Sequence, residues 1–262
     1  MDLAKLTATA LQMGGVDQLW AATESGSEVT IERSDIALIA IPTTAGTGAE
    51  VTRFAVLYRD GIKCSLSGDA LKPDAWALDP SLLASLPRSV IADAGLDAVC
   101  QAMESLWSVR STSESEDHAQ AALGLAIEHL ETAVHSSDND SITGMQISAH
   151  LAGKAINLTT TTAPHALSYG LTSLFGIPHG RAVAILFGQV FRRNMKVSDS
   201  DCTHPAGSKF VRRRLEEIAE CWGQTCESFP AWWEGYLSHR LQLPSFNARA
   251  TTQSSPLSRH GA

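Results

Sequence analysis

A change in hydrophobic pattern at Pro87 constrains the fold of this chain more than any other sequence feature. Upstream of Pro87, short apolar segments are separated by turns that contain glycine and threonine, as in an α/β domain. Downstream, apolar residues recur at helical spacing over residues 88–107, 113–134, 143–158, 165–174, 180–193, 210–223 and 229–244. We therefore predict an α/β domain over residues 1–87 and an all-α domain over residues 88–246.

The composition of the chain narrows the class of protein. Of the 262 residues, 44% are hydrophobic and 18% are charged, which is enough for a substantial core. The net charge of −8 argues against a nucleic-acid-binding surface, because such a surface needs a basic patch. No apolar run reaches the roughly 18 residues of a transmembrane helix, so we expect no membrane partner. The five cysteines include no CxxC pair, which favours a cytoplasmic location over a disulfide framework.

The segment IALIAIP, residues 36–42, is a continuous apolar run rich in isoleucine. Such a run predicts a strand that is buried inside a parallel sheet. The segment TTAGTGAE, residues 43–50, follows at once, and its small residues and hydroxyls would let a phosphate approach the backbone. From these eight residues alone, an ordinary glycine-rich turn is the more frequent interpretation.

Further strand-like segments follow this turn. Residues 53–59 and 62–68 flank the pair Asp60-Gly61, which is typical of a type I′ turn, and together they predict a β-hairpin. Residues 72–80 predict another short strand that ends at a proline.

Three side chains of types that bind divalent metals lie in otherwise apolar, helix-like sequence. Asp97 lies in AGLDAVCQAMES, His165 in TTTAPHALSYG and His179 in FGIPHGRAVAI. Burying such groups without partners is costly, and a divalent metal bound to all three would remove that cost. Three protein ligands with one open position are typical of a catalytic metal site. On spacing alone the commoner alternative is that the histidines are core residues with one hydrogen bond each.

Long motifs of the chain resemble those of the iron-containing, or group III, alcohol dehydrogenases. IPTTAGTGAEVT, ADAGLDAVCQAMES and APHALSYGLTSLFGIPHG occur in the family's order, and the resemblance covers residues 2–244. It implies a dehydroquinate synthase-like fold, in which part of a Rossmann-like nucleotide domain precedes a helical metal-binding domain. It also implies Fe(II) or Zn(II) held by Asp97, His165 and His179, and NAD(H) or NADP(H) as the second cofactor. Within the family, TTTTAPHALSY and DAGLDAVCQA are most similar to the phosphonoacetaldehyde reductase branch, which makes 2-hydroxyethylphosphonate.

The same resemblance implies where the dinucleotide binds. The family's TTxxTxSE motif contacts the cofactor, and Ala49 stands here in place of the usual serine. Asp2 stands where the family has the aspartate of a GGGSxxD loop, but the glycines of that loop do not precede it. For Lys63, a solvated strand lysine is an equally good interpretation. The residues implied in cofactor binding are Asp2, Thr43, Thr44, Thr47, Glu50 and Lys63.

Two positions near the expected metal depart from the family pattern. Gln101 lies one helical turn after Asp97, where the alcohol dehydrogenase branch has a further histidine ligand. Its amide oxygen would be a weak ligand, because oxygen amides suit harder ions than Fe(II) or Zn(II). Tyr169 stands where the family often has a histidine that moves a proton, and its hydroxyl would need a lowered pKa for that role.

The expected reaction is the reduction of a small aldehyde, with the metal polarising the carbonyl and the nicotinamide delivering a hydride. A phosphonate substrate would need cations nearby. Arg181 and Lys154 are candidates, although each alone is more often a surface residue. We expect Glu104 to support a metal ligand and Asp93 to cap the helix.

Two alternative functions stay open. Relative to the family the chain looks shortened at both ends, and residues 247–262 are polar and aperiodic, which predicts a disordered tail. A fragment with little or no activity is therefore one alternative. A glycerol-dehydrogenase-like polyol oxidoreductase is the other, because those relatives also use three protein ligands. The sequence leaves the oligomeric state open, a homo-oligomer included.

Overall fold

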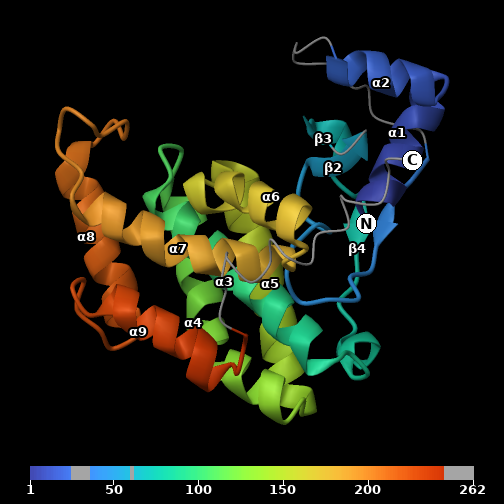
Figure 1. Ribbon diagram of the computed structural model, residues 1–262. Coiled ribbons are helices and arrows are strands. Elements are labelled where there is room, and N and C mark those ends of the chain that lie inside the picture. The colour runs from blue at the N-terminus through green and yellow to red at the C-terminus, as the bar shows by residue number, and fades with distance from the viewer. Residues whose placement is uncertain (25–35, 60–61, 245–262) are drawn as a thin grey trace, which may run out of the picture.

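The computed structural model describes residues 1–24, 36–59 and 62–244 (Figure 1). The predicted type I′ turn at Asp60-Gly61 and the predicted tail at residues 247–262 lie outside the described residues. Where it is described, the chain has a small α/β region at its N-terminal end and a larger helical region after it.

The region after Pro87 is helical, as the sequence predicts, and it forms a bundle built around one central helix (Figure 1). Its helices are α3 (Arg88–Trp107), α4 (Ser113–His135), α5 (Asn139–Thr159), α6 (Ala163–Phe175), α7 (His179–Met195), α8 (Gly207–Cys221) and α9 (Phe229–Gly235), with a π-helical turn, η3 (Tyr236–Arg240), after α9. Helices α4, α5, α7 and α8 all pack against α3. The bounds of α3 are those expected from the sequence, and α4 to α8 differ from expectation by a few residues at their ends. The helix expected over residues 229–244 is instead the short helix α9 followed by the π-helical turn η3.

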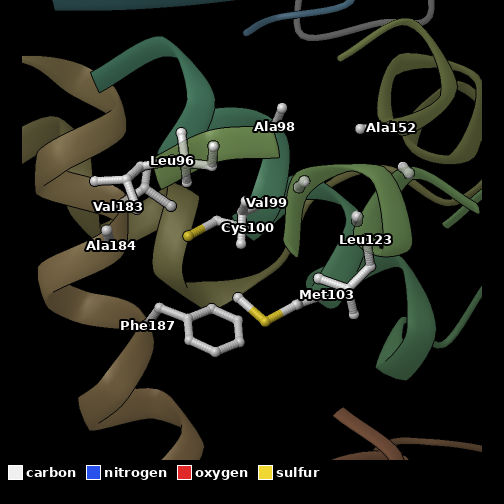
Figure 2. Close-up of a cluster of buried hydrophobic side chains, with 14 of the residues drawn as sticks. Leu96, Ala98, Val99, Cys100, Met103, Leu123, Ala152, Val183, Ala184 and Phe187 are labelled. Atoms are coloured by element: carbon white, nitrogen blue, oxygen red, sulfur yellow. The ribbon is translucent and has the colours of Figure 1, made fainter. Parts of the chain in front are cut away.

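Helix α3 is buried along almost its whole length from Ile91 onward. In Figure 2, Met103 of α3 lies between Phe187 of α7 and Leu123 of α4. Each fully buried side chain of this size contributes about 1.5–3 kcal/mol through the hydrophobic effect. Because most of α3 is buried, a polar group on this helix needs a partner inside the protein or a bound ligand.

The α/β region contains two separate pairs of strands. Its elements are α1 (Asp2–Met13), α2 (Val16–Glu24), β1 (Ile39–Ala40), β2 (Phe54–Arg59), β3 (Ile62–Ser67), β4 (Ala75–Trp76) and the short 3-10 helices η1 (Asp69–Leu71) and η2 (Pro80–Leu83). Strands β2 and β3 are antiparallel with Arg59 opposite Ile62, so the predicted two-residue hairpin is confirmed in its register. Strand β1 pairs in parallel with β4.

The prediction of a buried strand over residues 36–42 is wrong. Only Ile39–Ala40 is a strand, and Ile36, Ile39 and Ile41 are each at least half exposed, at 53%, 65% and 50%. An apolar strand becomes buried when a sheet has neighbours on both edges and layers on both faces. Among the described residues, β1 has only the two-residue strand β4 as a neighbour.

The α/β region is joined to the bundle mainly at α5. A Cβ at Gly48 would overlap the Cα of Gly153, so the loop over residues 43–50 touches the α5 backbone directly. Gly48 also has a φ of +57°, which glycine adopts without strain. The amide of Arg53 donates to Oδ1 of Asn157 at 2.9 Å. These contacts place α1, β2 and the loop beside the part of the bundle that carries the predicted metal ligands.

Candidate metal centre and its cavity

Three helices bring the predicted metal ligands together. Asp97 lies in the middle of α3, His165 in the first turn of α6, and His179 is the first residue of α7. Each offers one ligand atom, and these atoms all lie within 4.8 Å of one another. Asp97 and His165 are each 4% exposed, whereas the side chain of His179 is 37% exposed, so the cluster is buried on the side of Asp97 and His165.

A close contact between two helices sets the position of His179. Helix α6 ends at Phe175 and is capped by Gly176, which has a left-handed φ of +66°, and Pro178 precedes α7. A Cβ at Gly180 would overlap the carbonyl oxygen of Asp93 on α3. Only glycine therefore allows the start of α7 to approach α3 closely enough for His179 to reach Asp97.

Hydrogen bonds within the cluster orient its side chains. His165 contacts Oδ1 of Asp97 through Nε2 at 3.1 Å and Oε1 of Glu104 through Nδ1 at 2.5 Å. Nε2 of His179 lies 3.8 Å from the same oxygen of Asp97. The other oxygen of Glu104 accepts from the amide and the hydroxyl of Thr162, at 2.5 Å and 2.8 Å. Glu104 therefore ties His165 to the segment between α5 and α6, and such a carboxylate behind a histidine fixes the orientation of the imidazole.

The charges of the cluster favour a cation. Burial by itself lowers the pKa of His165, but the carboxylates of Glu104 and Asp97 outweigh burial and raise that pKa to about 10. Burial by itself raises the pKa of Asp97, yet hydrogen bonds and positive charge, first of all from His165, hold it below its usual value. Two buried carboxylates thus create a negative field at the imidazole Nε2, and a divalent metal would meet the same field.

The donor set fits a divalent metal. Nε2 of Gln101 donates to Oδ2 of Asp97 at 3.1 Å, while the buried Oε1 of Gln101 has no hydrogen-bond partner. The unpaired Oε1 of Gln101 would gain a partner if a cation, or a water bound to that cation, lay between Asp97 and the two histidines. One oxygen and two nitrogen ligands with room for a fourth suit Zn(II) or Fe(II).

The cluster lines a cavity of about 620 Å³. Its other walls come from α1, β2, the loop over residues 43–50 and the segment between α5 and α6; they include Asp2, Thr47, Phe54, Thr160 and Thr161. Tyr169 also lines the cavity, with its ring stacked on that of His179 at a centroid distance of 6.2 Å. A volume of this size is typical of sites for small molecules and cofactors.

The residues predicted to bind the cofactor divide into two groups. Asp2 and Thr47 line the cavity, and the side chain of Asp2 accepts from the amide of Val56 at 3.1 Å. Glu50 is buried away from the cavity and contacts Nδ1 of His150 at 3.0 Å. Thr43 and Thr44 lie in the same loop as Thr47, but they are not among the residues that line the cavity. The side chain of Lys63 lies outside the described part of the structure.

The cations predicted for a phosphonate lie elsewhere. Arg181 makes a two-pronged ion pair with Asp93, at 2.9 Å and 3.0 Å. The prediction that Asp93 caps α3 is wrong, because the N-cap residue is Pro87 and Asp93 lies within the helix. Lys154 lies over the ring of Trp76 at 5.9 Å. Neither side chain lines the cavity; the described lining includes Arg110 instead, which the sequence did not single out.

The fold and the metal cluster define a class of protein: the chain belongs to the iron-containing alcohol dehydrogenase family. The family model for iron-containing alcohol dehydrogenase matches residues 1–80, and that for the C-terminal part of Fe-containing alcohol dehydrogenases matches residues 91–232. The fold predicted from the resemblance is therefore confirmed. Of the described helices, none is long and apolar enough to cross a membrane.

Individual relatives refine this comparison. The chain is 40% identical over 231 residues to phosphonoacetaldehyde reductase of Streptomyces viridochromogenes, covering 86% of this chain and 58% of that protein. It is similar to the crystal structure of sulfoacetaldehyde reductase from Bifidobacterium kashiwanohense in complex with NAD+, with a TM-score of 0.78 and 26% identity over 96% of this chain and 65% of the other. A 1,3-propanediol oxidoreductase structure gives a TM-score of 0.81 at 26% identity, over 96% and 64%. The chain thus spans somewhat less than two thirds of these relatives.

Proposed function

We propose that this chain carries the catalytic metal centre of an NAD(P)H-linked aldehyde reductase, and that phosphonoacetaldehyde is its substrate. The observation that carries the proposal is the cluster of Asp97, His165 and His179, which lines a cavity large enough for a small substrate. The likeness to a phosphonoacetaldehyde reductase supports the choice of substrate. The four cysteines that are free in the described part of the chain support a cytoplasmic location.

The protein side chains would have distinct roles. Asp97, His165 and His179 would hold the metal, with Gln101 as a weak additional oxygen ligand. When bound, the metal would supply Lewis-acid polarisation of the aldehyde, and the nicotinamide would supply the hydride. Glu104 would accept the hydrogen bond from Nδ1–H of His165 and so keep Nε2 directed at the metal.

Tyr169 would handle the proton of the reaction. Its ring lines the cavity next to His179, so its hydroxyl would donate the proton that the alcohol product needs. For the cofactor, Asp2 and Thr47 are the predicted residues on the cavity wall, and they would contact the dinucleotide there.

The metal centre is tested through Glu104, whose loss leaves all three ligands in place. We expect Glu104→Gln to weaken Zn(II) binding about 10- to 100-fold, because the neutral amide orients and polarises His165 less well. A chelator-competition titration measures this affinity. Glu131→Gln is the matched control, since Glu131 lies on α4 and pairs with Arg240. Equal affinity in Glu104→Gln and the wild type would contradict the assigned metal site.

The reaction is tested by NADH oxidation with phosphonoacetaldehyde, using the chain loaded with Fe(II) or Zn(II). Turnover that disappears in Asp97→Ala supports the proposal. Preferential oxidation of glycerol would favour the polyol oxidoreductase instead. Tight metal binding without turnover of any aldehyde or alcohol would favour the inactive fragment.

A further inference from the structure

The cavity beside the metal cluster contains one permanently charged cation among its described lining residues, and that cation is Arg110. Two acidic residues share the lining. Asp97 is committed to the histidine cluster, and Asp2 accepts a hydrogen bond from the backbone of β2. The guanidinium of Arg110 makes no ion pair or hydrogen bond with any described residue, so its charge is available to a ligand.

The backbone around Arg110 is held in place. Helix α3 ends at Trp107, and the hydroxyl of Ser108 donates to the carbonyl of Thr159 at 3.0 Å. The amide of Arg110 donates to the same hydroxyl at 3.3 Å. His204 contacts the carbonyl of Ser108 at 3.2 Å. The backbone at Arg110 is therefore fixed by hydrogen bonds, while its long side chain is exposed and lines the cavity.

Hydroxyl groups also line this cavity, in the run of four threonines that begins with the last residue of α5 and ends just before α6. The outer two are used by the fold: Thr159 contacts the hydroxyl of Ser105 at 3.0 Å, and Thr162 is held by Glu104. The inner two, Thr160 and Thr161, line the cavity. The hydroxyl of Thr160 donates to the carbonyl of Thr161 at the long distance of 3.5 Å, and the hydroxyl of Thr161 makes no hydrogen bond with a described residue.

The backbone of this segment is strained. Thr160 has a φ of +63° and a ψ of +169°, which is rare and costly for a β-branched residue. Hydrogen bonds hold the flanking residues Thr159 and Thr162, and Thr160 and Thr161 between them line the cavity. Strain of this kind is concentrated at ligand-binding sites, where the fold holds groups ready for a partner.

We propose that Arg110, with the hydroxyls of Thr160 and Thr161, forms a subsite for a phosphonate or phosphate dianion. The guanidinium matches two oxygens of such a group at once, and hydroxyl donors complete its coordination. This inference rests on the proposed function in one respect: it assigns the subsite to the charged end of an aldehyde substrate whose carbonyl lies at the metal cluster. The diphosphate of the dinucleotide is the other source of the same chemistry.

Calorimetric titration of the Zn(II)-loaded chain tests the subsite without any turnover. The probes are 2-hydroxyethylphosphonate, NADH and the neutral alcohol 1-propanol. We expect Arg110→Gln to weaken 2-hydroxyethylphosphonate binding about tenfold to hundredfold and to leave NADH and 1-propanol unchanged. Thr161→Val, which keeps the side-chain shape, should weaken only the phosphonate, by severalfold.

Arg193→Gln serves as the matched control, because Arg193 is an exposed arginine on α7 whose guanidinium lies near Asp201. A loss confined to NADH supports the anion subsite and assigns it to the cofactor. Unchanged binding of both anions in Arg110→Gln would overturn the subsite. If phosphonate binding depends on Arg110 but no aldehyde is reduced, the subsite stands and the proposed function fails.

Discussion

The helical region and the α/β region of this protein differ in how they are stabilised. In the bundle, one continuous core extends from α3 to η3 and includes an aromatic cluster of Trp107, Phe187, Phe191, Phe229 and Trp233. The α/β region has a separate, much smaller core of short aliphatic side chains. That core consists of Leu6, Ala10, Leu19, Ala55, Leu66 and Leu71.

This difference bears directly on the site. Asp97 and His179 lie on helices of the large core, and His165 lies on α6, which packs against α7 and is tied to α3 through Glu104. The part of the cavity lining that includes Asp2 and Phe54 belongs to the α/β region, which depends on the small core and on its contacts with α5. We therefore expect metal binding to survive changes that loosen the α/β region, whereas ligands that span the cavity should be sensitive to them.

The largest expected effect comes from the aromatic cluster. Phe187 is fully buried and stacks on Trp107 at a centroid distance of 5.0 Å, so Phe187→Ala should cost about 3–5 kcal/mol. Leu71→Ala removes a fully buried side chain from the small core in the same way. In Phe187→Ala, hydrogen exchange should become faster in α3 and α7. In Leu71→Ala, it should become faster in α1 and β2 and stay unchanged in the bundle. Equal exchange changes in both regions would mean that they unfold as one unit.

A buried amine allows the α/β region to be tested separately by pH. Lys5 of α1 is 1% exposed, and its Nζ donates to the carbonyls of Thr52 and Phe54 at 2.6 Å and 2.9 Å. Burial lowers the pKa of Lys5 to about 8 from 10.5, although the charges of Asp2 and Glu50 oppose the shift.

Between these two pH values the unfolded chain holds the proton of Lys5 more tightly than the folded chain, so stability should rise as pH increases through this window. The expected gain is about 3 kcal/mol relative to Lys5→Met, which has no amine to titrate. Urea unfolding of both proteins at about pH 7 and about pH 10.5 measures the difference. A constant difference between the two curves would refute the assigned pKa shift.

The smallest expected effect concerns the contact between the two regions. A Cβ at Gly153 would lie 2.7 Å from the Cα of Gly48, so Gly153→Ala should push the loop off α5 and cost about 1–3 kcal/mol. Gly124→Ala is the matched control in a helix, because nothing lies within 4 Å of that position. The control should instead stabilise the protein by about 1 kcal/mol. Thermal unfolding distinguishes the two signs, and a stabilising Gly153→Ala would show that the loop moves without cost.

The helices were predictable because the signals that form them are local. The capping box of Thr112 and Ser115 at the start of α4, and the Asp138 cap of α5, are encoded within four residues of the helix ends. The strand expected at residues 36–42 was not predictable in the same way, because burial of a strand depends on neighbours that its own residues do not specify.

The sequence by itself determined the helical region and the chemical types of the three side chains that we propose as metal ligands. The tertiary structure alone decided the partners around them. Glu104 meets His165 across 61 residues of sequence, and Glu50 meets His150 across 100. Arg110 shares a cavity with the metal cluster only because the segment after α3 and the threonines after α5 pack together. Periodicity and capping act within a few residues, whereas charge pairing and cavity walls arise when distant segments meet, so only the folded chain shows them.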